Sequence, residues 1–192
     1  MDVNPITIGV GLLALVVLIY AVILYNQLVT IKHAVSKAWS NIDVLLRQRH
    51  DELPKLVDTC QRYMQHEQET LEKVVQARGA VSQARQQGDV KGLGQAETML
   101  RAGLGQLFAV VENYPELKAN ESFQHLQSRI TGLENGIADR RELYNSAVNI
   151  NNVRIEQFPD VLIARAFNFT AAELLQFSAE EKADVNIRAL FT

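Results

Sequence analysis

The residues of this 192-residue chain that could do chemistry do not complete any catalytic or metal-binding pattern. His66 and Glu67 match the start of the helical zinc-protease motif, but Thr70 stands where that motif needs its second histidine. The Gly92–Gly94 stretch is not followed by the rest of a phosphate-binding loop. Cys60, the only cysteine, lies among apolar residues and is more typical of a small buried side chain than of a reactive thiolate. We therefore expect no enzymatic activity, no metal and no cofactor.

Polar and charged residues interrupt the apolar stripes of the predicted helices, and they are the most unusual feature of the sequence. We call this set the polar layer; its members are Glu67, Arg78, Glu134, Arg141, Tyr144, Asn145 and Asn152. Buried charges are costly unless they are paired. The simplest interpretation is therefore a paired layer that fixes the register of the helices. The alternatives are a ligand or partner site inside the bundle and an exposed face for self-association.

Helical periodicity accounts for nearly the whole chain, and no segment shows the sustained alternation that strands require. Pro54 either kinks the first bundle helix or occupies the first turn of the next one. Asn120 is a suitable N-cap, and Thr170–Glu173 has the pattern of a capping box. The ranges expected for the later helices are 55–87, 90–114 and 120–158, followed by short apolar pieces at 161–169 and 172–177.

These elements predict an all-α protein, in which an N-terminal transmembrane helix continues into an elongated antiparallel bundle of about four long helices with short C-terminal helices. Four glycines predict close packing of the third bundle helix: Gly92, Gly94, Gly103 and Gly105. The apolar C-terminal pieces, which include Phe167 and Leu174, either cover the end of the bundle or form a surface for neighbouring subunits or lipid. The expected organisation is a short segment at 1–5, a transmembrane helix at 6–25, a bundle domain at 26–177 and a tail at 178–192.

The uncharged stretch from Ile6 to Tyr25 is long enough to cross a bilayer. About twenty residues at a helical rise of about 1.5 Å span about 30 Å, which is the thickness of the hydrocarbon core. Tyr20 and Tyr25 suit the membrane interface, where amphipathic rings are favourable. A cleaved signal peptide fits less well, because Asp2 stands where a basic residue is expected and the apolar run is too long.

The charges beside this stretch predict its orientation. Lys32 and Lys37 follow it and no lysine or arginine precedes it, so we expect the N-terminus outside and the bundle in the cytoplasm. The formal net charge of the chain is −3, which gives no reason to expect a nucleic-acid partner. The expected partners are membrane lipid and further copies of the chain, with an unidentified protein partner as the alternative.

Several motifs resemble those of the LemA family of bacterial membrane proteins along nearly the whole chain. The stretches that carry the resemblance are 25–29, 38–44, 49–57 and 111–120, together with Glu134, Ile137, Arg141, Tyr144 and Asn145, and Phe158 with Pro159. The chain departs from the family at Asn151, where a tyrosine is frequent, and at Lys55, where an asparagine is usual. The resemblance implies a helical bundle on an N-terminal anchor in the bacterial inner (cytoplasmic) membrane, with no enzymatic activity.

Two functions follow from these features. The first is a non-enzymatic, self-assembling membrane scaffold, and the similarity of the family to a magnetosome membrane protein points in the same direction. The second is a membrane-tethered adaptor or receptor that binds a protein partner through the polar layer. A hydrolase would need a cluster of carboxylates or histidines, and the sequence contains no such pattern.

Overall fold

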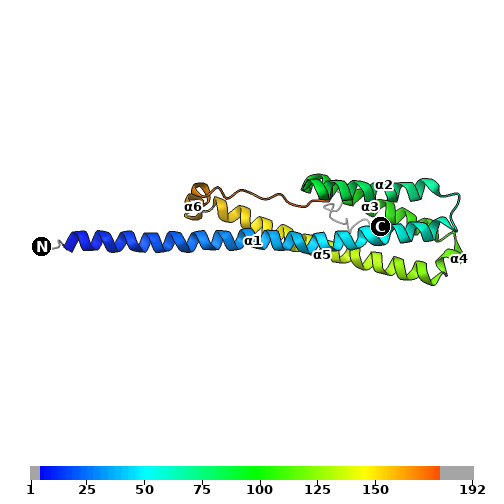
Figure 1. Cartoon of the computed structure of the whole chain (residues 1–192), viewed down its shortest axis with the longest axis horizontal. Coiled ribbons are helices and arrows are strands. Elements are labelled where there is room, and N and C mark those ends of the chain that lie inside the picture. Colours follow the sequence, from blue (N-terminus) through cyan, green and yellow to red (C-terminus); the bar gives the residue numbers. More distant parts are fainter. Residues whose placement is uncertain (1–4, 178–192) are drawn as a thin grey trace, which may run out of the picture. The chain divides into compact units, whose positions relative to one another are not determined.

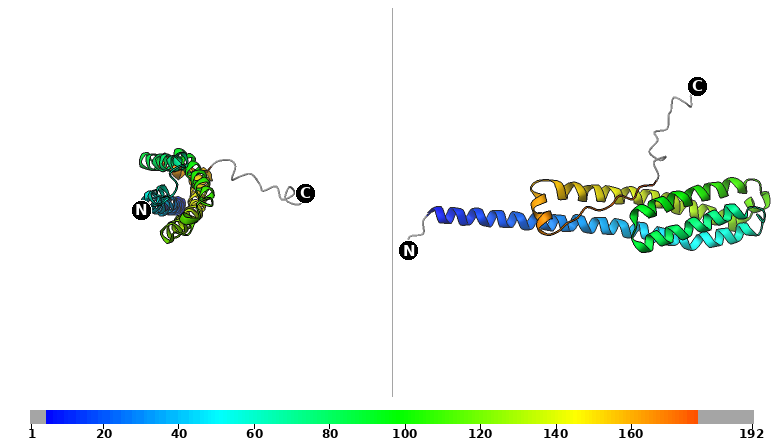
Figure 2. Two further views of the ribbon diagram at one scale, coloured as in Figure 1. Left: turned by 90° about the vertical axis from the view of Figure 1, so that its right-hand side faces the viewer. Right: turned by 90° about the horizontal axis from the view of Figure 1, so that it is seen from above.

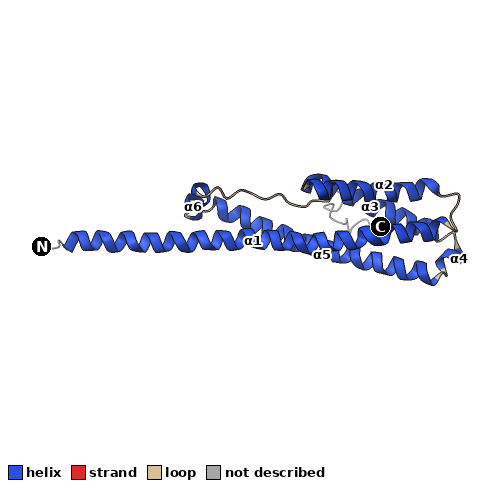
Figure 3. Ribbon diagram, viewed as in Figure 1, coloured by secondary structure: helices blue, strands red, loops and turns tan. Residues whose placement is uncertain are grey.

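A computed structural model describes residues 5–177 of the chain (Figure 1). These residues form six α-helices and no strand, which confirms the all-α prediction (Figure 3). The helices are α1 Pro5–Gln61, α2 Gln68–Gln87, α3 Val90–Val111, α4 Pro115–Lys118, α5 Glu121–Glu156 and α6 Asp160–Ala166. The expected tail at 178–192 and residues 1–4 of the expected N-terminal segment lie outside the described residues.

The first helix does not end near Pro54, so the prediction of a second helix from Lys55 to Gln87 is wrong. Helix α1 runs through Pro54 to Gln61, and α2 begins only at Gln68. A proline inside a helix leaves the carbonyl four residues earlier without its usual N–H donor. Here that carbonyl belongs to His50, and the Nε of Arg78 donates to it at 3.0 Å. A side chain of α2 thus replaces the missing backbone donor, and the helix continues.

The remaining helix ends follow local capping chemistry. The carboxylate of Asp89 accepts a hydrogen bond from the Gly92 amide at 2.8 Å and caps α3. Gly88 adopts a left-handed conformation (φ 68°) at the end of α2, which favours glycine. Asn120 caps α5 as predicted, because its side-chain oxygen accepts from the Phe123 amide at 3.1 Å.

The predicted helix at 172–177 is absent, since residues 169–177 form no regular structure. The Ala172 N–H donates to the Asn152 side chain at 2.9 Å, and the Ala172 carbonyl accepts from the same amide at 2.9 Å. Further along, the backbone of Gln176 lies so close to Gly94 that a Cβ on residue 94 would clash with it. These backbone contacts to α5 and α3 replace the hydrogen bonds of a helical turn. Gly94 therefore allows the close approach of an extended segment, not of a helix.

The chain divides into two compact units. Unit 1 consists of the described residues up to Trp39 and of Leu143–Ala172; unit 2 consists of Ser40–Glu142 and the described residues from Glu173 onward. Unit 1 thus contains the apolar part of α1, the last part of α5, and α6. Unit 2 contains the last part of α1, all of α2, α3 and α4, and the first part of α5.

Unit 2 is a helical bundle in which the long helix segments lie side by side (Figure 2). Its buried side chains follow steps of four and three along each helix, which places them on one stripe. On α1 this stripe is Ile42, Leu46, Arg49, Leu53, Leu56 and Cys60. On α3 it is Leu93, Glu97, Leu100, Leu104, Leu107 and Val111. Each stripe contains one charged residue among apolar ones.

Unit 1 contains the part of α1 that is apolar enough to cross a membrane. Within the described chain, α1 alone is both long and apolar enough for this by length and composition, and 6% of its most apolar window is buried. The core helix of a soluble protein would be mostly buried, whereas a membrane helix exposes its side chains to lipid. Ile6, Tyr20 and Tyr25 all lie on this exposed part of α1.

Candidate functional site

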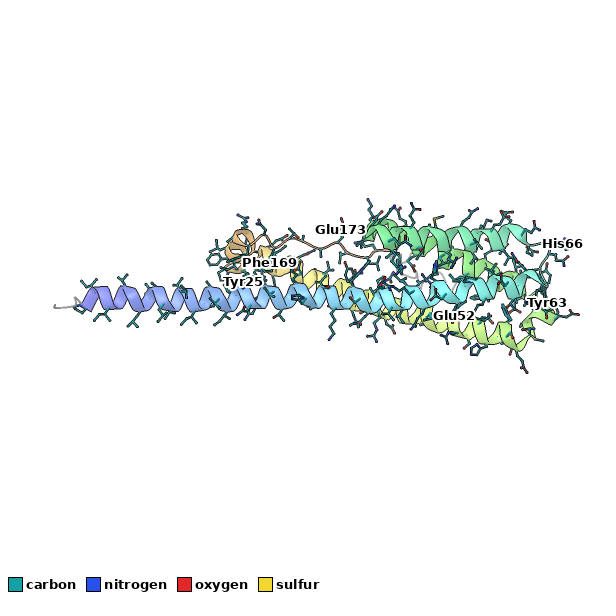
Figure 4. All side chains as sticks on the ribbon, in the orientation of Figure 1. Tyr25, Glu52, Tyr63, His66, Phe169 and Glu173 are labelled. Carbon is teal, nitrogen blue, oxygen red and sulfur yellow. The ribbon has the colours of Figure 1, made fainter. Side chains whose placement is uncertain are left out.

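The aromatic collar of unit 1 lies at the end of the apolar stretch of α1. We use this name for Tyr25, Phe167 and Phe169, whose rings are in contact although Tyr25 is far from the other two in the sequence (Figure 4 labels Tyr25 and Phe169). The ring centroids of Tyr25 and Phe167 are 4.8 Å apart, and those of Tyr25 and Phe169 are 5.9 Å apart in an edge-to-face arrangement. The sequence predicted an interface role for Tyr25, and the collar shows which segment lies beside it.

Two asparagines of α5 hold the chain that follows α6. The side chain of Asn152 forms two hydrogen bonds with the backbone of Ala172, and the Nδ2 of Asn151 donates to the Thr170 carbonyl at 3.2 Å. Asn151 is buried and Asn152 is half-buried. At position 151, where a tyrosine is frequent in the LemA family, the asparagine of this chain contacts the backbone of Thr170. We call this pair the asparagine clamp.

Arg154 links α5 to its neighbours in the same unit. One of its terminal nitrogens donates to Gln27 of α1 at 2.6 Å and contacts the Asp160 carboxylate at 2.7 Å. Asp160 is buried at the start of α6, so this ion pair compensates a carboxylate that burial would otherwise destabilise. Arg154 therefore fixes α6 beside α1.

A surface stripe of α5 exposes large apolar side chains. Leu143, Ile150 and Val153 are 55%, 50% and 43% exposed. They follow one another at steps of seven and three residues, which places them on one face of the helix. We call them the α5 stripe. Ile150 also lines a groove of about 590 Å³ between α1 and α5, together with Ile23, Asn26, Gln27, Thr30, Ile31 and Arg154.

The buried charge cluster of unit 2 consists of Arg49 on α1, Glu97 on α3 and Glu134 on α5. The side chain of Arg49 is 1% exposed and forms ion pairs with both carboxylates, at 2.5 Å to Glu134. Arg101 lies on the outer side of Glu134, at 3.5 Å from its second oxygen. The cluster joins three helices at one level of the bundle, which is the register-fixing arrangement that buried polar groups can provide.

The electrostatics of this cluster are asymmetric. Burial lowers the pKa of Arg49, but the two carboxylates outweigh it and raise that pKa above its ordinary value. Burial raises the pKa of Glu97, and the attraction of Arg49 only partly opposes this shift. The charge of Arg49 is therefore strongly held, whereas the charge of Glu97 is the less favoured one.

A second polar contact joins α1 and α2. Arg78 donates to the His50 carbonyl and also contacts the His50 ring nitrogen Nε2 at 2.8 Å. Burial lowers the pKa of His50, and the nearby charge of Arg78 lowers it further. The imidazole is thus held neutral, with Nε2 accepting from the guanidinium.

The polar layer predicted from the sequence is distributed over both units. Glu67, Arg78, Glu134 and Arg141 lie in unit 2, whereas Tyr144, Asn145 and Asn152 lie in unit 1. In unit 2, Glu67 accepts from the Tyr114 hydroxyl at 3.3 Å, and the guanidinium of Arg141 lies 4.0 Å from the centre of the Phe177 ring. In unit 1, the ring of Tyr144 contacts Trp39 in a tilted arrangement with centroids 5.3 Å apart, and Asn145 is half-buried one residue later.

Sequence reasoning missed Arg49 and Glu97, the two most buried charged residues of the cluster. The sequence did mark both positions, because each charged residue stands within a row of apolar residues spaced by four and three.

The apolar C-terminal residues were expected either to cover the bundle or to form an exposed surface, and each alternative holds for some of them. Leu175 and Phe177 are buried in unit 2, whereas Phe167 and Leu174 remain exposed.

The turn between α1 and α2 borders a groove of unit 2. This groove of about 910 Å³ is lined mainly by polar side chains and includes Gln61, Met64, Gln65, His66, Gln68 and Glu72 (Figure 4 labels His66 and the nearby Tyr63).

Among residues 5–177, no group of three or more histidine, cysteine or acidic side chains is arranged to hold a metal ion. Burial raises the pKa of the Cys60 thiol to about 12, so it is protonated at neutral pH.

Comparison with known proteins gives a consistent family match. The family model described as the LemA family matches residues 38–188. The magnetosome protein MamQ 2 of Paramagnetospirillum magneticum is 28% identical over 175 residues, which cover 79% of this chain and 64% of the relative. MamQ of Magnetospirillum gryphiswaldense is 25% identical, with 86% of this chain and 70% of the relative covered. Protein LemA of Metamycoplasma hominis is 26% identical, with 86% and 74% covered. The chain thus spans less than two thirds of the length of the Paramagnetospirillum relative.

Proposed function

Because the chain belongs to the LemA family, we propose that it is a non-enzymatic membrane scaffold: α1 anchors it and copies assemble side by side through the α5 stripe. Membrane association is the part of this proposal with two independent supports. One is the exposed apolar length of α1, and the other is the similarity to proteins named as magnetosome proteins. Self-assembly is the further step, and its support is the α5 stripe.

The observation that carries the proposal is the exposure of the α5 stripe. Leu143, Ile150 and Val153 have the spacing of a coiled-coil seam and lie in the same unit as the membrane helix. Exposed apolar residues that form a row on one helix mark contact surfaces more often than isolated ones do. Copies anchored in one membrane share one orientation, so a two-fold contact would place each α5 stripe against its own counterpart.

The polar layer supports a structural role more than an enzymatic or receptor role. Glu134 of this layer is paired with Arg49, Arg78 contacts His50, and Asn152 bonds to the backbone of Ala172. These contacts engage the three side chains inside the fold. An adaptor function therefore has its best support in the polar groove beside His66, where amide side chains face a hollow of about 910 Å³.

Disulfide trapping in membranes tests the α5 stripe directly. A Val153→Cys substitution in a Cys60→Ser background provides one thiol per chain, because Cys60 is the only native cysteine. We expect oxidation to give a covalent dimer, since a two-fold contact brings the two 153 positions within disulfide reach, about 4.4–6.8 Å between Cα atoms.

The matched control is Val75→Cys in the same background, because Val75 is 47% exposed on α2 and lies outside the stripe. We expect it to remain monomeric under the same oxidation. Dimers from neither position would contradict the proposal. Equal dimer formation from both positions would also contradict it, because it would indicate random collision.

The proposed orientation places the N-terminus outside and the bundle in the cytoplasm of a bacterial inner membrane. Its basis is the position of Lys32 and Lys37 after the apolar stretch. Protease added to intact spheroplasts should leave residues 40–142 uncut, whereas detergent should make them accessible. Cleavage of this region before detergent is added would reverse the orientation.

A further inference from the structure

We infer that the corner between α5 and α6 is a second membrane contact, which inserts Phe158, Leu162 and Phe167 into the lipid interface beside the anchor. The occupant of this apolar surface is the phospholipid bilayer itself. The inference rests on the membrane anchoring of α1 in the proposed function. It does not require self-assembly.

The depth of the corner follows from the aromatic collar. Tyr25 ends the apolar stretch of α1 and is followed by the polar residues Asn26 and Gln27, so it lies where the hydrocarbon core meets the headgroups. Phe167, the residue directly after α6, contacts the ring of Tyr25 in a tilted arrangement with centroids 4.8 Å apart. Helix α6 has seven residues and is therefore about 10 Å long. Any part of α6 is then within about 10 Å of the collar, which is within the depth of the interfacial layer.

The exposure of the corner is the second step. Phe158, Leu162 and Phe167 are 80%, 60% and 59% exposed. Large apolar side chains gain free energy when they leave water, so three of them at one exposed corner favour an apolar neighbour. Short amphipathic segments at this depth bury such side chains among the headgroups and the upper acyl chains.

The orientation of α6 is the third step. Asp160 and Ala164 are buried, and Asp160 is held by Arg154. Leu162 lies between them in sequence and about 160–200° away around the helix, so it points away from the unit. Arg165 is also exposed, and its long side chain can extend toward lipid phosphates while its stem stays among apolar groups.

Quenching by brominated phospholipids tests the contact in the full chain. The protein is reconstituted in vesicles whose lipids carry bromine on the upper acyl chain. The native fluorophore is removed by Trp39→Phe, and single tryptophans are introduced by Leu162→Trp or Phe158→Trp. We expect both to be quenched at least threefold more strongly than a Leu143→Trp control. Leu143 is 55% exposed but lies about 20 Å before the end of α5.

Equal quenching overturns the inference. If Leu162→Trp and Phe158→Trp are quenched no more than Leu143→Trp, the corner does not touch lipid. The wavelength of the tryptophan emission then tells what covers the corner. A red-shifted emission indicates water, a blue-shifted emission indicates a second copy or a protein partner, and both exclude the lipid contact.

A Val17→Trp variant in the same background separates this failure from a failure of the anchor. Val17 lies in the exposed apolar part of α1 and should be quenched strongly. If it is not quenched, α1 does not enter the bilayer, and both the anchoring and the corner contact are excluded. If it is quenched while the corner variants are not, only the corner contact is excluded.

Discussion

Arg49 is the most buried charged residue of the bundle in unit 2. It is 1% exposed and lies between two carboxylates on different helices. Removing one member of a buried ion pair leaves the remaining charge uncompensated, which typically costs about 3–5 kcal/mol. We expect Arg49→Met to lower the free energy of unfolding by about this amount, measured by urea unfolding of the detergent-solubilised chain with circular dichroism.

The matched comparison is Glu97→Gln. Burial already disfavours the charge of Glu97, and glutamine keeps an oxygen that accepts from Arg49. Glu134 also remains as a charged partner of Arg49. The loss for Glu97→Gln should therefore be well below that for Arg49→Met. Equal losses would mean that the guanidinium is not the centre of the cluster.

His50 provides a pH-dependent stability with a defined sign. Its pKa in the fold is lower than the ordinary value of 6.5, mainly because of burial and then because of Arg78. The unfolded chain therefore binds a proton at higher pH than the folded chain does. The contribution of neutral His50 to the free energy of unfolding is complete above about pH 6.5. It is lost as the pH falls through the folded pKa, with a slope of at most about 1.4 kcal/mol per pH unit. Unfolding curves from about pH 7.5 to about pH 5 should show this decline, and His50→Gln should remove it. A decline of the same size in His50→Gln would assign it to other groups.

At the scale of helices, α1 illustrates where local sequence rules are overridden. Proline inside a helix usually costs about 3 kcal/mol, so ending the helix near Pro54 was the reasonable prediction. The carbonyl of His50 instead accepts from Arg78, a residue 28 positions later. No local pattern reveals such a contact, because it depends on how α2 packs against α1.

This replacement of a backbone donor by a side-chain donor can be tested with a double-mutant cycle. Arg78→Met should be more destabilising in the native chain than in a Pro54→Ala background. With alanine at position 54, the backbone N–H can donate to the His50 carbonyl and replace Arg78. We expect a coupling of about 1–3 kcal/mol, which is the cost of leaving a buried polar group without a partner. Additive effects in thermal or urea unfolding would show that Arg78 acts only through packing.

The segment after α6 depends on the asparagine clamp. Asn152→Ala removes two hydrogen bonds to the backbone of Ala172. At about 1 kcal/mol for each bond, the Ala172 amide should exchange roughly 10- to 30-fold faster with solvent deuterium. Hydrogen–deuterium exchange of peptides covering 168–174 measures this effect. Asn149→Ala, an exposed position on the same helix, should leave the exchange unchanged. Unchanged exchange in Asn152→Ala would mean that other contacts hold this segment.

For the whole molecule, composition and periodicity were sufficient to predict the helical fold and the long apolar helix near the N-terminus. These features repeat over many residues, so single exceptions do not obscure them. The ion pairs of Arg49 and the extended course of residues 169–177 could not be predicted in the same way. They depend on contacts between residues far apart in the chain, and only a broken apolar stripe at Arg49 and Glu97 marked where to look.

The central claim is that copies of this chain assemble in the membrane through α5. The most direct measurement is the native mass of the full chain extracted together with its surrounding lipid. The account predicts a mass of two or more chains, reduced to one chain by Ile150→Asn combined with Val153→Asn and unchanged by Val75→Asn. A single chain at every concentration of the unsubstituted protein would contradict it.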